Sequence, residues 1–150
     1  MSESYKKYLS KNSVFFLNVK TKTELLDAMA SRVVAEDSSL DKSELVTKLE
    51  EREELMSTGM GLGIGVPHLR YSAIKNPRVL VGICRSGIQD YESMDGQPVK
   101  IVAMILVGES QHQEYLKILS ELMKKLKQDD VRKKILSASS PEEVYNILIG

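Results

Sequence analysis

The sequence predicts a layered α/β domain in which helices cover both faces of one sheet. Segments with helical periodicity alternate with strand-like segments along the chain. The two central strand-like segments, 78–84 and 99–107, are apolar almost throughout, which argues against a sheet with one face in water. A length of 150 residues suits a single domain spanning 1–150 with one core.

The first third of the chain predicts one strand and two helices. Residues 14–17 form an apolar strand-like segment, and 21–37 follow with apolar residues at helical spacing. Thr21 and Glu24 have the spacing of a capping box at the start of that helix. A second helix is expected over 38–56, with Asp41 and Glu44 near its start.

The second half predicts two strands and three helices. The strands 78–84 and 99–107 are separated by a turn at 95–98. Amphipathic helices are expected over 114–128 and, more briefly, over 129–138. The last helix, 140–149, has Ser140 as N-cap, Pro141 at its first position and Glu143 at its third.

Composition excludes several classes of function. Lys plus Arg and Asp plus Glu both number 21, so the basic excess typical of nucleic-acid binding is missing. The longest apolar run is far shorter than the ~20 residues of a membrane helix, and the N-terminus lacks an apolar signal core. Cys84 is the only cysteine, and we expect a buried thiol in a reducing, cytoplasmic compartment.

A glycine-rich segment follows the second helix. Four glycines alternate with other residues at Gly59, Gly61, Gly63 and Gly65. Glycine is entropically costly, but it permits positive φ and lets another group approach the backbone. The segment is therefore expected either to be a loop whose N–H groups converge on an anion or to be a tight strand-to-strand turn.

The glycines do not match the nucleotide-binding motifs. A Walker loop ends in Gly-Lys-Ser/Thr, but no lysine lies between Lys48 and Lys75. The dinucleotide pattern needs glycines at places one, three and six, and counting from Gly59 the sixth place is Ile64.

His68 directly follows Pro67 at the end of this segment. Proline fixes its own φ and favours an extended residue before it, so the histidine leaves a stiffened backbone. An imidazole with a pKa near ~6.5 is mostly neutral and nucleophilic at neutral pH. The alternative is an ordinary histidine making one hydrogen bond.

Arg52 is the candidate charge partner of His68. The helical period places it on one stripe with Leu45, Leu49 and Met56, which we expect to face inward. A guanidinium in that position needs a carboxylate or a phosphate. A structural ion pair is the alternative.

Phosphoryl acceptance would explain these features together. A phosphorylated side chain gains roughly −1.5 to −2 charges, which Arg52 and convergent donors would stabilise during transfer to His68. We expect the phosphate-binding donors to come from Ser57, Thr58, Gly63 and Gly65. For Ser57 and Thr58 the alternative is an ordinary turn at the C-terminus of the helix.

The segment REELMSTGMGLGIGVPHLR resembles the signature of the fructose/mannitol-type enzyme IIA domains of the bacterial phosphoenolpyruvate-dependent phosphotransferase system, which include nitrogen-regulatory IIA proteins. The later segment RSGIQDYESMDGQPVKIVAMILVG is also similar to that family, and the resemblance covers nearly the whole chain. It implies a mixed, mostly parallel sheet flanked by helices, and no cofactor.

The resemblance also implies roles and partners. His68 would take phosphate from the phosphocarrier HPr or its nitrogen-branch relative, and Arg52 matches the active-site arginine of the family. The phosphate would then pass to a IIB domain for sugar uptake or act as a signal to a regulated target protein. No nucleic acid and no direct membrane insertion are implied.

One position departs from the family pattern. Sugar-transporting members often carry a second histidine early in the helix after the last long strand, and Tyr115 occupies that place here. If Ser110 caps this helix with Gln113, His112 falls in its first turn, three residues from Tyr115 and on the same face. Either side chain is a candidate substitute, and both being ordinary surface residues is the alternative.

A metal site is a further hypothesis. It would combine His68, His112 and an acidic residue, but their spacing has no metal-binding signature. No metal is therefore expected.

Overall fold

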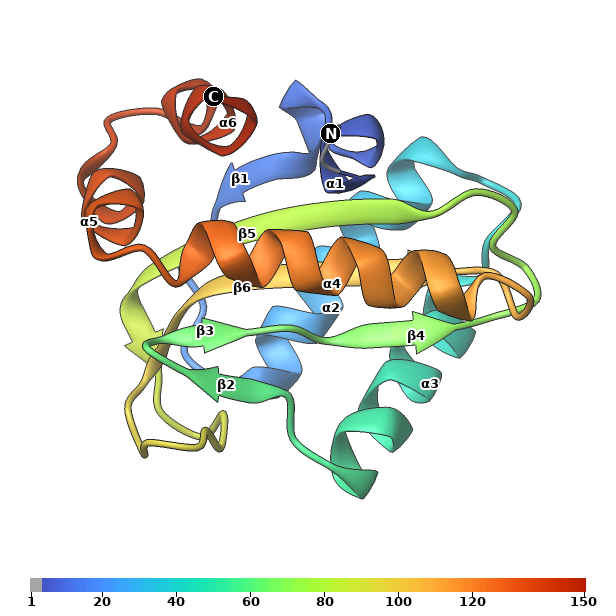
Figure 1. Ribbon diagram of the computed structural model, residues 1–150. Helices are drawn as coiled ribbons and strands as arrows, with labels where there is room; N and C mark the ends of the chain where they lie inside the picture. The colour runs from blue at the N-terminus through green and yellow to red at the C-terminus, as the bar shows by residue number, and fades with distance from the viewer. Residues whose placement is uncertain (1–3) are drawn as a thin grey trace.

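The computed structural model describes residues 4–150, and a six-stranded mixed sheet forms its centre (Figure 1). The strands are β1 (Val14–Phe16), β2 (Gly59–Gly61), β3 (Ile64–Gly65), β4 (His68–Arg70), β5 (Arg78–Ile88) and β6 (Val99–Val107). The helices are α1 (Ser4–Tyr8), the short 3₁₀ helix η1 (Lys11–Ser13), α2 (Lys22–Glu36), α3 (Lys42–Leu55), α4 (His112–Leu126), α5 (Asp129–Ser137) and α6 (Pro141–Ile149). Every predicted helix and strand is present in the predicted order, but the elements come in runs: five strands, β2 to β6, follow one another, and so do three helices, α4 to α6.

The sheet is mixed, with parallel pairing in the majority, as expected. Its order is β1-β5-β6-β3-β2, and β4 also pairs with β6. Among the described residues, three strand pairings are parallel (β1 with β5, β3 with β6, β4 with β6) and two are antiparallel. The long β5–β6 pairing is antiparallel, so a hairpin forms the middle of the sheet.

Helices cover both faces of the sheet. Alternate residues of β6 point to opposite sides, so Ile101, Ala103 and Ile105 join one buried cluster while Val102 and Met104 join the other. The first cluster packs against α4 and the C-terminal helices, and the second packs against α2 and α3. In Figure 1, α4 crosses in front of the sheet and α2 and α3 lie behind it.

The predicted caps fix the starts of three helices. The side chains of Thr21, Asp41 and Ser140 each accept a backbone N–H three residues later. His112 lies in the first turn of α4 as expected, but the N-cap residue is Gln111 and not Ser110. The Gln111 side chain instead accepts the Gly108 N–H and donates to the Lys75 carbonyl, which fastens the loop before α4.

The glycine-rich segment is a tight hairpin followed by a broken strand, so the expected alternative of a strand-to-strand turn is confirmed. β2 and β3 pair in antiparallel fashion, and Gly61, Leu62 and Gly63 between them all have positive φ. β3 and β4 then both run parallel to β6, with Val66 and Pro67 between them. The segment therefore places His68 at a defined point on the sheet.

Two further elements differ from the prediction. α1 was not predicted, and its Tyr5 hydroxyl donates to the Leu148 carbonyl, a partner far away in sequence. β5 continues past residue 84 to Ile88. Within residues 4–150, no helix has both the length and the apolar character needed to cross a membrane.

Candidate active site

His68 is the first residue of β4 and lies at an edge of the sheet. It pairs with Ile105 of β6, and in the described part of the chain β4 has no second strand neighbour. Pairing begins here because the Pro67 carbonyl accepts the Ile105 N–H while Pro67 itself has no N–H to donate. Side chains of α4 and of the last turn of α3 can therefore both contact the half-buried imidazole.

The two ring nitrogens of His68 have different partners. Nδ1 lies 3.1 Å from the Val66 carbonyl oxygen, and Nε2 lies 3.1 Å from Nη2 of Arg52. A carbonyl only accepts and a guanidinium only donates. The proton of the neutral ring therefore lies on Nδ1, and the lone pair of Nε2 faces Arg52.

The environment keeps this imidazole neutral. Burial lowers the pKa of His68 from its ordinary value, and the positive charge of Arg52 lowers it further. The hydrogen bond to the Val66 carbonyl and the negative charge of Glu53 oppose the shift without cancelling it. The ring is thus held in its nucleophilic form.

Arg52 lies in the last turn of α3, but the predicted inward stripe is partly wrong. Leu45 and Leu49 are fully buried, whereas Met56 is 68% exposed because the helix ends at Leu55. Glu53 takes the buried position instead. Arg52, half-buried beside it, extends across the sheet edge to His68.

Aromatic rings cover the other side of the imidazole. The Tyr115 ring of α4 stacks on His68, with centroids 4.7 Å apart and planes 24° apart. His112, the exposed first residue of α4, contacts the Tyr115 ring at a centroid distance of 6.0 Å. Burial raises the pKa of Tyr115, so its phenol stays protonated. The structure therefore brings all three rings together, with Tyr115 contacting both histidines.

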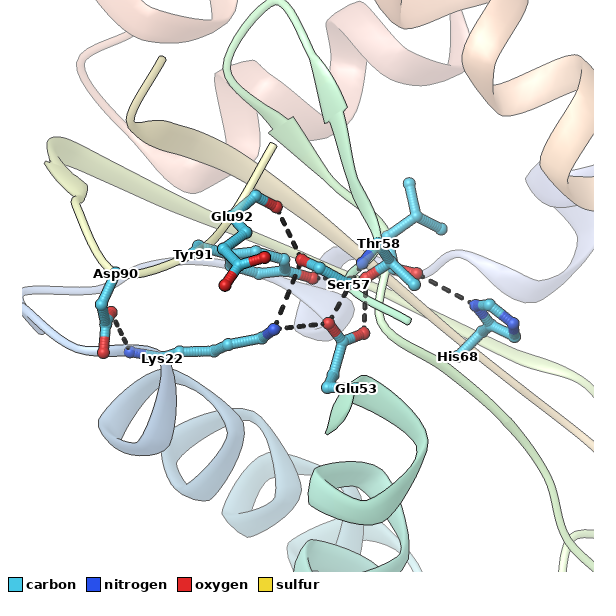
Figure 2. Close-up of polar contacts among 9 residues, drawn as sticks. Lys22, Glu53, Ser57, Thr58, His68, Asp90, Tyr91 and Glu92 are labelled. Carbon is cyan, nitrogen blue, oxygen red and sulfur yellow. Dashed lines mark hydrogen bonds and ion pairs between the residues drawn. The ribbon is translucent and has the colours of Figure 1, made fainter. Parts of the chain in front are cut away.

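The two predicted hydroxyl donors both have protein partners (Figure 2). The Ser57 hydroxyl donates to the Glu92 carbonyl. The Thr58 hydroxyl, which is buried, donates to Glu53 at 2.5 Å and accepts from the Tyr91 hydroxyl at 2.6 Å. Neither hydroxyl is directed to His68.

The structure does not bring the two predicted glycines to His68 either. Gly63 lies in the hairpin turn, where its carbonyl accepts from the N–H groups of residues 100 and 101. Gly65 pairs with Val102, three residues along β6 from the partner of His68, which corresponds to about 10 Å. A Cβ on Gly65 would come within 2.9 Å of the Tyr91 ring, so this glycine makes room for an aromatic side chain.

Sequence reasoning missed a buried polar cluster next to the site, formed by Lys22, Glu53, Thr58 and Tyr91 and here called the Glu53 cluster. Lys22 Nζ lies 2.7 Å from Glu53 Oε1 and 4.4 Å from the centre of the Tyr91 ring. Burial and the nearby Glu53 carboxylate raise the pKa of Tyr91. The signal in the sequence was the adjacent Arg-Glu pair with Thr58 shortly after it, but Lys22 and Tyr91 lie far from it along the chain.

The side-chain arrangement does not suit a metal ion at His68. Residues 4–150 contain no group of three or more His, Cys, Asp or Glu side chains placed to bind one. Nε2 faces a cationic guanidinium, and Nδ1 is held by a carbonyl.

Cys84 is fully buried, and burial raises the pKa of its thiol to about 11, which leaves it unreactive.

Comparison with known proteins gives consistent matches. A family model described as "Phosphoenolpyruvate-dependent sugar phosphotransferase system, EIIA 2" matches residues 7–150. The PTS system fructose-specific EIIA component of Haloferax volcanii is 40% identical over 119 residues, which are 79% of this chain and 73% of that protein. A nitrogen regulatory protein of Pseudomonas aeruginosa is 33% identical over 129 residues, covering 86% of this chain and 83% of the relative.

Solved structures agree with these relatives. The crystal structure of nitrogen regulatory protein IIA-Ntr from Neisseria meningitidis superposes with a TM-score of 0.87 at 30% identity. The match covers 95% of this chain and 97% of that one. Both the fold and the sequence therefore point to the same group of proteins.

Proposed function

The chain belongs to the EIIA 2 family of the phosphoenolpyruvate-dependent sugar phosphotransferase system, and we propose that His68 accepts the phosphoryl group on its Nε2 atom. One observation carries this proposal. The Val66 carbonyl holds the Nδ1 proton, which leaves the Nε2 lone pair directed at a cationic partner 3.1 Å away. A phosphohistidine formed at Nε2 would therefore appear beside the charge that stabilises it.

The transfer step balances without another reactant. The Nε2 lone pair attacks phosphorus, the bond between phosphorus and the donor breaks, and the donor keeps that electron pair. The Nδ1 proton stays in its hydrogen bond to Val66. Such a step depends mainly on positioning and on electrostatic stabilisation.

Arg52 has two roles in this proposal. In the free protein, its guanidinium donates to the lone pair that attacks. During transfer it turns these donors to the phosphoryl oxygens, where a planar group with five N–H donors can hold more than one oxygen. The phosphoryl oxygens thus replace Nε2 of His68 as the hydrogen-bond acceptors of Arg52.

Membership of the family indicates the partners. The phosphate donor would be a carrier of the HPr type, and the acceptor a IIB domain. The single buried Cys84 agrees with a reducing compartment, and we place the protein in the cytoplasm.

A regulatory role is the second candidate. It is supported by the close superposition with IIA-Ntr and by the similarity to nitrogen regulatory proteins. In that case the phosphorylation of His68 would control binding to a target protein. Mixing the phosphorylated chain with a fructose-type IIB domain distinguishes the phosphocarrier role from the regulatory role, because only a phosphocarrier passes its phosphate to the IIB domain.

The proposal is tested by phosphorylating the protein with phosphoenolpyruvate, enzyme I and HPr. Intact mass is then measured at alkaline pH, because phosphohistidine is acid-labile. We expect the wild type to gain one phosphoryl group and His68→Ala to gain none. A phosphorylated His68→Ala variant would overturn the assignment.

A further inference from the structure

The Glu53 carboxylate is buried and accepts three hydrogen bonds. It is only 6% exposed. Oε1 accepts from Lys22 Nζ at 2.7 Å and from the Thr58 N–H at 3.1 Å, and Oε2 accepts from the Thr58 hydroxyl at 2.5 Å. Glu53 therefore holds Thr58 by both its backbone and its side chain.

Thr58 is in turn connected to His68 through one residue. The Thr58 carbonyl accepts the Val66 N–H at 3.0 Å, and the Val66 carbonyl accepts the Nδ1 proton of His68. Figure 2 shows Glu53 bonded to Thr58, and His68 beyond them. A continuous set of hydrogen bonds thus runs from a buried carboxylate to the imidazole.

The Val66 carbonyl depends on this connection for its position. The residue lies between β3 and β4, outside the paired strands, and its N–H bonds to Thr58 rather than to β6. Pro67 follows it and offers no N–H that could hold the turn in another way. A shift of Thr58 would therefore move the group that orients His68.

We propose that Glu53 is a positioning residue for phosphoryl acceptance, which acts through Thr58 and Val66 to hold the His68 ring with its proton on Nδ1 and Nε2 toward Arg52. The inference rests on the proposed function of His68. It differs from a purely structural role, because the same carboxylate, through Val66, acts together with the Arg52 donor to select the ring nitrogen that carries the lone pair.

Glu53→Gln is the first test variant. The amide keeps the size of the side chain, but it has one acceptor oxygen where the carboxylate has two, and its NH₂ group would face a donor. Lys22 would lose its anionic partner, and the Thr58 hydroxyl, facing an NH₂ group, would have to turn its proton away and give up the hydrogen bond that it accepts from Tyr91. Glu54→Gln, on the exposed side of the same turn, is the matched control for the loss of one negative charge.

Thr58→Val is the second variant, and it tests the positioning role of Glu53 if Glu53→Gln does not fold. It removes the hydroxyl bond to Glu53 and keeps the shape of the side chain. Thr58→Ser keeps the hydroxyl and should restore the behaviour of the wild type.

The decisive readout is the tautomer of His68, measured by long-range ¹H–¹⁵N NMR. The chain has two histidines, so His112→Gln assigns the signals. We expect the Nδ1–H form in the wild type, Glu54→Gln and Thr58→Ser, and a mixture of tautomers in Glu53→Gln and Thr58→Val. The rate of transfer from phosphorylated HPr should fall at least about tenfold in the latter pair, with KM for HPr unchanged.

The outcomes separate the two proposals. If folded Glu53→Gln or, failing that, Thr58→Val keeps the tautomer and the rate of the wild type, the positioning role is overturned. If the wild type accepts no phosphate, the proposed function fails, while the tautomer comparison still decides whether Glu53 orients His68.

Discussion

The Nε2 atom of His68 lies 3.1 Å from Nη2 of Arg52, although β4 and α3 supply these residues from different layers of the fold. The contact is possible because β4 is an edge strand and α3 ends beside it. His68 stacks on Tyr115 of α4 on one side and meets the end of α3 on the other. The proposed acceptor therefore has an apolar support and a cationic partner, and its Nε2 lone pair lies toward that partner.

Arg52→Ala should slow phosphoryl transfer to His68. Removal of a donor aimed at developing charge typically costs on the order of 10²-fold or more. Arg52→Lys should recover only part of the rate, because an ammonium cannot copy the planar fork. Rapid-quench kinetics with phosphorylated HPr measures both, and a rate unchanged in Arg52→Ala would reduce this residue to a structural role.

The imidazole of His68 should titrate below the ordinary histidine pKa of 6.5. Burial and Arg52 disfavour the protonated ring, so the unfolded chain binds more protons than the folded protein just below that pH. The contribution of His68 to the free energy of unfolding is therefore fully present above about pH 6.5. It declines as the pH falls toward the pKa of His68 in the folded protein, which is lower.

Two measurements check this pH dependence. The His68 ring signals in an NMR titration should have a midpoint below 6.5. The difference in unfolding free energy between the wild type and His68→Gln should become less favourable to the wild type as the pH falls from about 7.5 to about 5. A midpoint at or above 6.5 would contradict the described environment.

Tyr115 should act through its ring more than through its hydroxyl. Tyr115→Phe keeps the surface that stacks on His68, and we expect it to accept phosphate at nearly the rate of the wild type. Tyr115→Ala removes a side chain that is only 8% exposed and should cost roughly 3 kcal/mol of stability. Urea unfolding measures the stability of Tyr115→Ala, and transfer kinetics measures the rate of Tyr115→Phe. A strong loss of rate in Tyr115→Phe would show that the phenol hydroxyl takes part in phosphoryl transfer.

The glycines should differ in their tolerance to alanine. A Cβ on Gly59 would lie 2.1 Å from the Glu92 carbonyl oxygen, whereas a Cβ on Gly96 would meet nothing within 4 Å. Gly59→Ala should therefore destabilise severely, while Gly96→Ala should cost about 1 kcal/mol for its positive φ. Thermal unfolding compares the two, and equal losses would contradict the close packing of Gly59.

Local signals in the sequence were sufficient for most of the fold. The caps at Thr21, Asp41 and Ser140 and the apolar strand β6 depend on residues within a few positions of each other, and each was predicted correctly. α1 was missed because its Tyr5 bonds to a residue near the other end of the chain. Such long-range partners leave no periodic pattern.

The candidate site was less accessible to sequence reasoning. His68 and Arg52 were predicted as partners, and the structure places them in contact. The glycines predicted either an anion-binding loop or a strand-to-strand turn, and the structure has the turn, in which Gly65 makes room for Tyr91 and Gly59 for the chain near Glu92. These close approaches depend on a loop some 30 residues away, which spacing alone cannot reveal.

The position of the phosphoryl group on the imidazole tests the central claim most directly. The protein would be labelled with ¹⁵N, phosphorylated by HPr and kept at alkaline pH, and one-bond coupling between ¹⁵N and ³¹P would be recorded. Because the Val66 carbonyl holds the Nδ1 proton of His68, we expect the coupling at Nε2 of His68. Coupling at Nδ1, or on His112, would contradict the assignment.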